Sequence, residues 1–345
     1  MALCRFSAAL VSLALCAAPA AADPVADFYR GKTITTYIGY GVGGGYDLFA
    51  RTISRHMPRH IPGNPTMLPV NMPGASSMVL GNHLAKRAPQ DGTAIGAVNS
   101  ALVFDALFAG QESKAQFRGP DMTMIGNAVS SASVLVAWHT SGVKTIDDLR
   151  QKPLIVGATS RSGDTYLLPL AVKNVLGLDR LKIITGYPGT REAAIALERG
   201  EITGRVWDME GIKAGRPQWL RDGSLNIVAQ LAPRKMPEVP ASVPLVKDYL
   251  SNDEDRKVLD VIFISTVLAR PYIAPPGIPA ERAKALRDAF MATMSDAEFL
   301  AEVHKLQLTI DPTSGEEMER IVRDAYGLPE NIVLKVRRAL SDGGI

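Results

Sequence analysis

The chain of 345 residues is long for one domain and short for three, so its length favours two domains or one large one. Hydrophobic residues make up 46% and charged residues 21%, which excludes a disordered, a fibrous or a polytopic membrane protein. Lys and Arg number 38 against 35 Asp and Glu, and this balance argues against a nucleic-acid binder, which would carry clustered basic residues.

Residues 1–22 have the layout of a secretory signal peptide. Arg5 gives a basic start, and an apolar run and a set of small alanines follow it. One alternative is an uncleaved membrane anchor, for which the apolar run is short. Another is a lipid anchor on Cys16, which the bulky Leu15 disfavours. Cleavage would remove both cysteines, Cys4 and Cys16, so we expect an exported, periplasmic chain without disulfides or Cys-ligated metal.

Strands and helices are expected to alternate along most of the remaining chain. The expected strands are 34–40, 67–71, 94–98, 134–138, 154–158, 182–185 and 202–207. The expected helices are 48–57, 76–87, one that starts at Thr145, 166–176, 190–199, 280–294, and two that start at the capping-box sequences of Ser295 and Ser314. This alternation indicates an α/β fold with mainly parallel sheets.

Four expected strand-to-helix junctions are rich in glycine and small hydrogen-bonding residues: Gly41 to Asp47, Asn99-Ser100, Thr159 to Thr165, and Tyr187 to Thr190. In an open parallel sheet, ligands bind at the carboxyl ends of strands, close to helix N-termini. Backbone N–H groups there favour an anion such as a carboxylate or a phosphate. Taken singly, such residues are more often caps and turns.

The usual enzyme and nucleotide motifs are incomplete. After Gly41 the chain has no Lys at the P-loop position, and Tyr46 replaces the third glycine of the dinucleotide pattern. The chain contains no G-x-S-x-G elbow and no H-E-x-x-H zinc motif. Asp208 and Glu210 form a carboxylate pair after an expected strand. They leave open a secreted α/β hydrolase or transferase, although no paired base or metal cluster supports one.

The order of several short motifs resembles the extracytoplasmic solute receptors of tripartite tricarboxylate transporters, the TctC-like or Bug family. The motifs extend over nearly the whole mature chain, and they are the Gly-rich loop with Tyr46 to Arg51, Asn71 to Ala75, Ala88 to Thr93, Gly157 to Ser160, Tyr187 to Ala193, Leu197 to Ile202, Arg234 to Pro240 and Ala274 to Pro279. One departure is Val42-Gly43, where the family loop usually has a proline. Arg161, Trp207 and Glu210 are also bulkier or more charged than the family pattern suggests.

The resemblance implies a type II periplasmic binding-protein fold, with two lobes joined by two crossing segments. We expect the signal peptide at 1–22, a discontinuous first lobe from 23–128 and 258–345, and a second lobe from 129–257. The resemblance places ligand contacts at two groups of loops, which are Gly43, Gly44, Gly45, Tyr46, Asp47 and Ser100 in the first lobe, and Thr159, Ser160, Arg161, Ser162, Pro188, Gly189, Thr190 and Asp208 in the second.

The function that the resemblance implies is capture of a small organic acid between the lobes and its delivery to membrane permease subunits. We expect no catalysis, no cofactor, no metal and a monomeric protein. A ligand-sensing partner of a membrane signalling protein would use the same fold, so the sequence leaves that alternative open.

Overall fold

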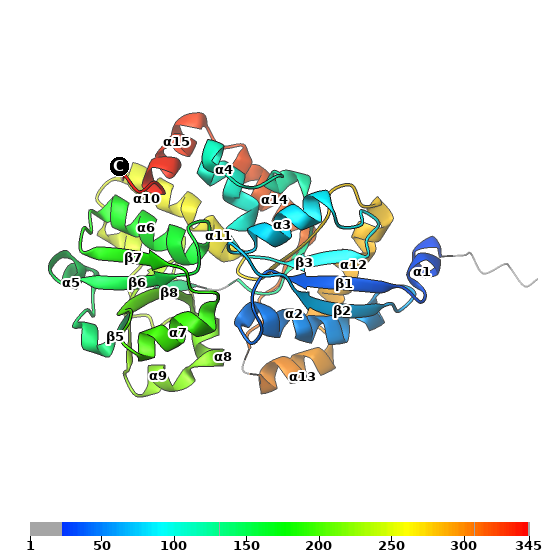
Figure 1. Ribbon diagram of the computed structural model, residues 1–345, viewed down its shortest axis with the longest axis horizontal. Helices are drawn as coiled ribbons and strands as arrows, with labels where there is room; N and C mark the ends of the chain where they lie inside the picture. The colour runs from blue at the N-terminus through cyan, green and yellow to red at the C-terminus, as the bar shows by residue number, and fades with distance from the viewer. Residues whose placement is uncertain (1–22, 131, 307, 344–345) are drawn as a thin grey trace, which may run out of the picture.

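The computed structural model describes residues 23–130, 132–306 and 308–343, so the expected signal peptide lies outside the described residues. Two β-sheets lie side by side, each flanked by helices on both faces (Figure 1). We call the parts built on them the first and the second lobe. No helix in the described ranges is both long and apolar enough to cross a membrane.

The first lobe contains a six-stranded sheet in the order β11-β4-β10-β3-β1-β2. Its strands are β1 (Thr33–Ile38), β2 (Thr66–Asn71), β3 (Ala94–Ala97), β4 (Thr123–Asn127), β10 (Pro271–Ala274) and β11 (Thr313–Ser314). Strands β2 and β3 pair in parallel with β1, whereas β10 pairs antiparallel with both β3 and β4.

The second lobe contains a five-stranded sheet in the order β7-β6-β8-β5-β9. Its strands are β5 (Ser133–Trp138), β6 (Leu154–Ala158), β7 (Leu181–Thr185), β8 (Gly204–Asp208) and β9 (Leu225–Leu231). Strands β7 and β8 pair in parallel with β6, whereas β5 pairs antiparallel with both β8 and β9. In each sheet the reversed inner strand is the first that the chain forms after it crosses from the other lobe.

Helices cover both faces of each sheet (Figure 1). Those of the first lobe are α1 (Pro24–Tyr29), α2 (Gly45–His56), α3 (Met78–Lys86), α4 (Asp105–Ala109), α12 (Ala280–Met294), α13 (Ala297–Lys305) and α14 (Gly315–Tyr326). Those of the second lobe are α5 (Ile146–Gln151), α6 (Asp164–Leu176), α7 (Thr190–Glu198), α8 (Met209–Gly215), α9 (Pro217–Arg221) and α10 (Asp253–Ile262). Short 3-10 turns are Met57–His60, Leu102–Phe104, Gly110–Glu112, Gly119–Asp121, His139–Ser141 and Val246–Tyr249.

The three larger buried apolar clusters among the described residues hold these layers together. One lies between the first sheet and helices α2, α12 and α13, and Phe49 and Phe290 are at its centre. A second lies under α7, α8 and α9 and contains Trp207 and Trp219. The third extends from α3 and α14 of the first lobe to α6 and α10 of the second, so the lobes share a continuous core on that side.

The two crossing segments run side by side between the lobes. The N–H of Ala128 donates to the carbonyl of Arg270 at 3.1 Å, and the N–H of Ala269 donates to the carbonyl of Val129 at 3.1 Å. The short helix α11 (Ile264–Val267) precedes this pairing on the return crossing. The expected boundary at 257/258 falls inside α10, which packs on α6, and we propose that the second lobe extends to the end of that helix.

The C-terminal helix α15 (Glu330–Ala339) follows α14 of the first lobe and packs on α4, α6 and α10. It therefore touches both lobes, and Figure 1 shows it at the top of the view, above α10 and beside α4. Beyond it, the side-chain amide of Asn174 in α6 donates to the carbonyls of Ala339 and Ser341 at 2.9 and 2.8 Å.

Candidate functional site

The Gly-rich loop connects β1 to α2 and depends on one glycine with a left-handed backbone. Gly43 has φ of +86°, a conformation that residues with a Cβ rarely adopt. Its N–H donates to Asp47 Oδ2 at 2.9 Å, and Asp47 also accepts from Arg51 Nε at 2.9 Å and Asn71 Nδ2 at 2.8 Å. The Asp47 carboxylate, 3% exposed, therefore fixes the shape of the loop.

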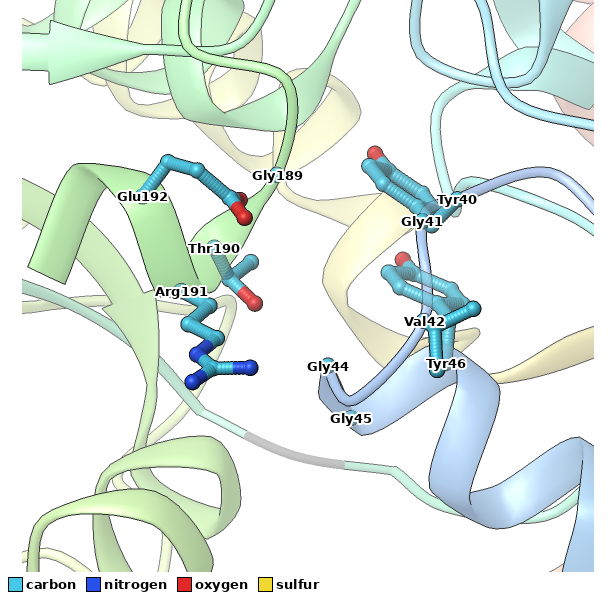
Figure 2. Close-up of a pocket in the computed structure, with 10 residues that line it drawn as sticks. All are labelled: Tyr40, Gly41, Val42, Gly44, Gly45, Tyr46, Gly189, Thr190, Arg191 and Glu192. Carbon is cyan, nitrogen blue, oxygen red and sulfur yellow. The ribbon is translucent and has the colours of Figure 1, made fainter.

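Two helix N-termini lie on opposite sides of the gap between the lobes. Gly44 is the N-cap of α2 and Gly189 is the N-cap of α7, and since glycine has no side chain, neither accepts a capping hydrogen bond from the first N–H groups of its helix. Figure 2 shows Thr190 and Arg191 of α7 directed toward the Gly-rich loop. A Cβ added to Gly44 would lie 3.2 Å from Thr190 Oγ1, so the lobes are in close contact here. Free N–H groups and helix dipoles on both sides favour an anion.

A narrow pocket, which we call the interlobe pocket, lies between these helix ends (Figure 2). It is lined by Tyr40, Gly41, Val42, Gly44, Gly45, Tyr46, Gly189, Thr190, Arg191 and Glu192. The rings of Tyr40 and Tyr46 stack at 4.5 Å and form its wall in the first lobe. Its free volume is about 20 Å³, enough for about one water molecule, so a larger ligand would require the lobes to separate.

A buried ion-pair cluster lies behind Tyr46 and joins the lobes. Arg270, in the return crossing, places Nη2 3.0 Å from Asp208 Oδ1 and 3.4 Å from Glu210 Oε2. Its guanidinium also lies over the Tyr46 ring, 4.5 Å from the centroid. Asp208 additionally accepts from the N–H of Gly211 at 2.6 Å and so caps α8.

A third carboxyl group, that of the half-buried Asp164 at the start of α6, reaches from the second lobe to the first. Its Oδ1 accepts from Asn99 Nδ2 at 2.7 Å, and its Oδ2 accepts from Ser100 Oγ at 3.3 Å. Asn99 Nδ2 also donates to the Tyr40 hydroxyl at 2.9 Å. The predicted contact Ser100 therefore lies in this cluster, bonded to a carboxyl group of the protein itself.

Burial and the charges of neighbouring groups shift the pKa values of the acidic and basic side chains in the cluster. Burial raises the pKa of Glu210 to about 8, although Arg270 opposes the shift. Burial also raises the pKa of Asp164, and the nearby Asp208 charge adds to that rise. Burial lowers the pKa of Arg205 to about 10. For Arg270, Asp208 and Glu210 outweigh burial and raise the pKa. In each of these groups, burial in a low-dielectric space disfavours the charged form.

The loop 159–162 contacts the first lobe at a second place. Thr159 Oγ1 and Ser160 Oγ each lie 2.8 Å from Ser76 Oγ, and Ser162 Oγ donates to the Ala75 carbonyl at 3.2 Å. Arg161 points away from the cluster and pairs with Asp342 near the C-terminus.

This loop also lines a larger cavity of about 1110 Å³ between α4, α6 and α15. Its wall contains cationic and apolar side chains, among them Lys114, Arg161, Arg337, Phe108 and Leu334, and also the acidic Asp105, Glu112 and Asp342. Most residues assigned to ligand contact from the sequence line one of two hollows. Gly44, Gly45, Tyr46, Gly189 and Thr190 line the interlobe pocket, whereas Thr159, Ser160, Arg161 and Ser162 line the larger cavity. Asp47, Ser100 and Asp208 line neither hollow. Gly43 lies beside Arg191, and Pro188 is exposed.

Sequence reasoning missed Arg270, Asp164 and Arg205, which the structure places in the cluster. Arg270 interrupts a mainly apolar stretch from Ile262 to Ala274, directly before strand β10, and a charge inside an apolar stretch is a usable signal. Asp164 lies inside the junction Thr159 to Thr165 that the sequence singled out, but it was not among the predicted ligand contacts. Within the described ranges, no group of three or more His, Cys, Asp or Glu side chains is arranged to hold a metal ion.

No protein-family model matches the chain, and no curated protein matches it. Solved structures do match. MatC from Rhodopseudomonas palustris, with bound malate, is 17% identical with a TM-score of 0.68, over 88% of this chain and 99% of MatC. The periplasmic binding protein BugD is 16% identical with a TM-score of 0.70, and the match covers 90% of this chain and 98% of BugD.

A second R. palustris protein, solved with adipate, is 16% identical with a TM-score of 0.67, over 88% of this chain and 96% of its own. At these identities the likeness shows the fold. The predicted two-lobed α/β periplasmic binding-protein fold is confirmed.

Proposed function

We propose that this chain is a periplasmic solute receptor that captures a small organic acid between its lobes and delivers it to the permease of a tripartite tricarboxylate-type transporter. The observation that carries the proposal is the pair of glycine-capped helix N-termini, at Gly44 and Gly189, on opposite sides of one gap. Each offers N–H groups free of side-chain caps, and a carboxylate between them would interact with both helix dipoles.

Two further observations support the proposal. The motifs quoted above follow the order found in receptors of tripartite tricarboxylate transporters. Proteins with the same fold have been solved with malate and with adipate, both small organic acids. The periplasmic location and the monomeric state are part of the proposal, as are the ligand contacts at Gly43 to Tyr46, Ser100, and Gly189 and Thr190.

The interlobe pocket has room for about one water molecule, so capture requires a hinge motion. The paired crossing segments near Val129 and Ala269 are the places where backbone rotation would separate the lobes. Closure on a ligand would replace the contact between Thr190 and the Gly-rich loop with contacts to the ligand. It would also remove the ligand from water, which strengthens its hydrogen bonds.

A role in binding accounts for the acidic residues better than hydrolysis does. Asp208 caps α8 and pairs with Arg270, and Glu210 lies buried beside the same guanidinium. A general base needs access to the proton that it removes, whereas these carboxyl groups are held between a helix end and an arginine. The sensing role would use the same binding step and differs only in the membrane partner.

The test is calorimetry on protein that has been unfolded and refolded to remove any solute carried from the cell. Mono-, di- and tricarboxylates would be titrated in turn, and circular dichroism would verify the refolded state. We expect saturable one-to-one binding by at least one carboxylate. A folded protein that binds no member of the panel would contradict the proposal. Turnover of a carboxylate ester that is lost in Asp208→Asn would favour the hydrolase instead.

A further inference from the structure

We infer that Arg205, buried in the second lobe behind the start of α7, supplies the positive charge that holds the carboxylate of a bound acid at that helix end. The inference rests on the proposed function and concerns how the site distinguishes an acid from an uncharged analogue. Arg205 does not line the interlobe pocket, whereas Thr190, which it contacts, does. Arg205 is therefore a positioning residue that acts from behind Thr190.

Arg205 lies on β8, on the face of the second sheet that α7 covers. Arg205 and Trp207 are two residues apart on the strand, so their side chains share that face. The residues that α7 buries are mainly alanines, whose small side chains leave room for a guanidinium group. Arg205 Nη1 donates to the carbonyl of Thr190, the first residue of α7, at 2.8 Å. Its guanidinium lies 3.9 Å from the centroid of the Trp207 ring, directly behind the first helical turn.

The start of α2 also has an arginine behind it, but the charge of that arginine is already neutralised. A Cβ added to Gly45, the first residue of α2, would lie 2.9 Å from Arg270 Nη2. The same atom lies 3.0 Å from Asp208 Oδ1 and 3.4 Å from Glu210 Oε2. Arg205, in contrast, forms no ion pair with any carboxylate among the described residues. The positive charge without a counter-ion is therefore at the start of α7.

This charge lies in a place where it is costly. Arg205 is fully buried, and its Nε is one of the buried side-chain atoms without a hydrogen-bond partner in the described part of the chain. Burial lowers the pKa of Arg205 to about 10, so the group still carries its proton at neutral pH. A buried charge without a partner is unfavourable, and the positive end of the α7 dipole adds to it. An anion bound at the first N–H groups of α7 would offset both.

The carboxylate of Glu192, in the first turn of α7, is the protein's own anion at this helix end. A Cβ added to Gly189 would lie 2.9 Å from Glu192 Oε2, so this side chain reaches back over the N-cap (Figure 2). Because Glu192 is exposed, water screens its charge, and it competes with a bound carboxylate. Arg205 and Glu192 should therefore have opposite effects on the binding of an acid.

The experiment compares acids with their uncharged amides. Refolded protein would be titrated with propionate and propionamide, succinate and succinamide, and adipate and adipamide. We expect at least one acid to bind at least tenfold more tightly than its amide, and this ratio to fall about tenfold in Arg205→Gln. Arg205→Lys keeps the charge and should retain the ratio within about threefold. Arg199→Gln, an exposed position at the other end of α7, is the control and should leave the ratio unchanged.

Two further measurements separate the charge of Arg205 from its role in packing. Glu192→Gln should bind the acid more tightly than the unaltered protein does. Weaker binding in both Glu192→Gln and Arg205→Gln would show that each variant disturbs the helix start, and the role of charge would be wrong. In the unaltered protein, the ratio of acid to amide should persist in about 1 M sodium chloride, which screens exposed charges over about 3 Å. Loss of the ratio in this salt would assign the discrimination to exposed groups such as Arg191, and this result does not require that any variant folds.

The outcomes separate this inference from the proposed function. Circular dichroism would verify that each variant is folded. If the acids bind and the folded Arg205→Gln keeps the ratio of the unaltered protein, the inference is wrong and the receptor for organic acids stands. The same conclusion follows if the amides bind the unaltered protein as tightly as the acids. If no acid, including the wider panel of carboxylates, binds the folded protein, the proposed function fails and the inference fails with it.

Discussion

The guanidinium of Arg270 and the carboxylate of Asp208 meet at 3.0 Å, although 62 residues separate them and they belong to different lobes. Arg270 lies in the return crossing and Asp208 at the end of β8, so the ion pair connects the hinge to the base of the binding gap. Any motion that separates the lobes must either break this ion pair or move both of its residues together.

Replacement of Arg270 tests what this pair contributes. Arg270→Gln would leave Asp208 and Glu210 without their shared cation in a buried site. Removal of one partner from a buried pair costs about 3–5 kcal/mol, so we expect the free energy of unfolding in urea to fall by about that amount. Arg30→Gln is the control, because the pair of Arg30 with Asp27 is exposed and should change the same measurement by less than about 1 kcal/mol. Equal effects of the two variants would contradict the role of the buried pair.

The raised pKa of Glu210 gives the stability a pH dependence. In the unfolded chain this carboxyl group ionises near pH 4.5, whereas in the folded protein its pKa is about 8. Between these values the folded protein holds a proton that the unfolded chain has lost, so this group reduces stability as pH rises from 4.5 to 8.

Glu210→Gln should remove this contribution, which is at most about 1.4 kcal/mol per pH unit inside that window. Urea unfolding of both proteins at pH 5, 6, 7 and 8 measures it. The variant should therefore gain stability relative to the unaltered protein as the pH increases. A difference between the two proteins that stays constant with pH would show that Glu210 does not hold a proton in the folded state.

Gly45 allows Arg270 to lie against the Gly-rich loop. A Cβ at this position would come 2.9 Å from Arg270 Nη2, although the backbone itself is helical and suits alanine. We therefore expect Gly45→Ala to weaken carboxylate binding about tenfold in calorimetry, with little change in helix content. Gly215→Ala is the control, because its added Cβ would meet only the Trp207 ring, at 4.0 Å. Unaltered binding in Gly45→Ala would indicate that Arg270 adjusts without cost.

The ligand could bind in the interlobe pocket or in the larger cavity beside α15, and one pair of variants distinguishes these two sites. Thr190→Val keeps the shape of the side chain and removes the hydroxyl group that faces the Gly-rich loop. We expect it to weaken binding several-fold. Arg338→Gln alters only the larger cavity near α15 and should leave the dissociation constant within about twofold. The reverse pattern would move the site to that cavity.

Local sequence patterns predicted much of the fold. They could not predict contacts between residues that are distant in the sequence. Helix α12 occupies 280–294 as expected, because its start after Pro279 and its amphipathic spacing are both local. Strand β10 was missed, since four residues that begin with Pro271 and are followed by Pro275 carry too little pattern. The helix expected to start at Ser295 is instead capped by Asp296, whose carboxylate accepts from the N–H of Phe299, because either residue can serve as N-cap.

The candidate site shows the same division. The Gly-rich loop and the start of α7 were found because glycines and small polar residues follow recognisable strands. Arg270 pairs with Asp208, and Asp164 accepts hydrogen bonds from Asn99 and Ser100, only because the two lobes meet at these residues. No spacing along the chain encodes such contacts.

The central claim, that an organic acid binds between the two lobes, is tested most directly by a crystal structure of the protein with the tightest ligand from the titrations. The account predicts density for its carboxylate within hydrogen-bond distance of backbone N–H groups at the starts of α2 and α7, near Gly44 and Thr190. Density for the ligand in the cavity beside α15, with the gap between Gly44 and Thr190 unchanged, would contradict it.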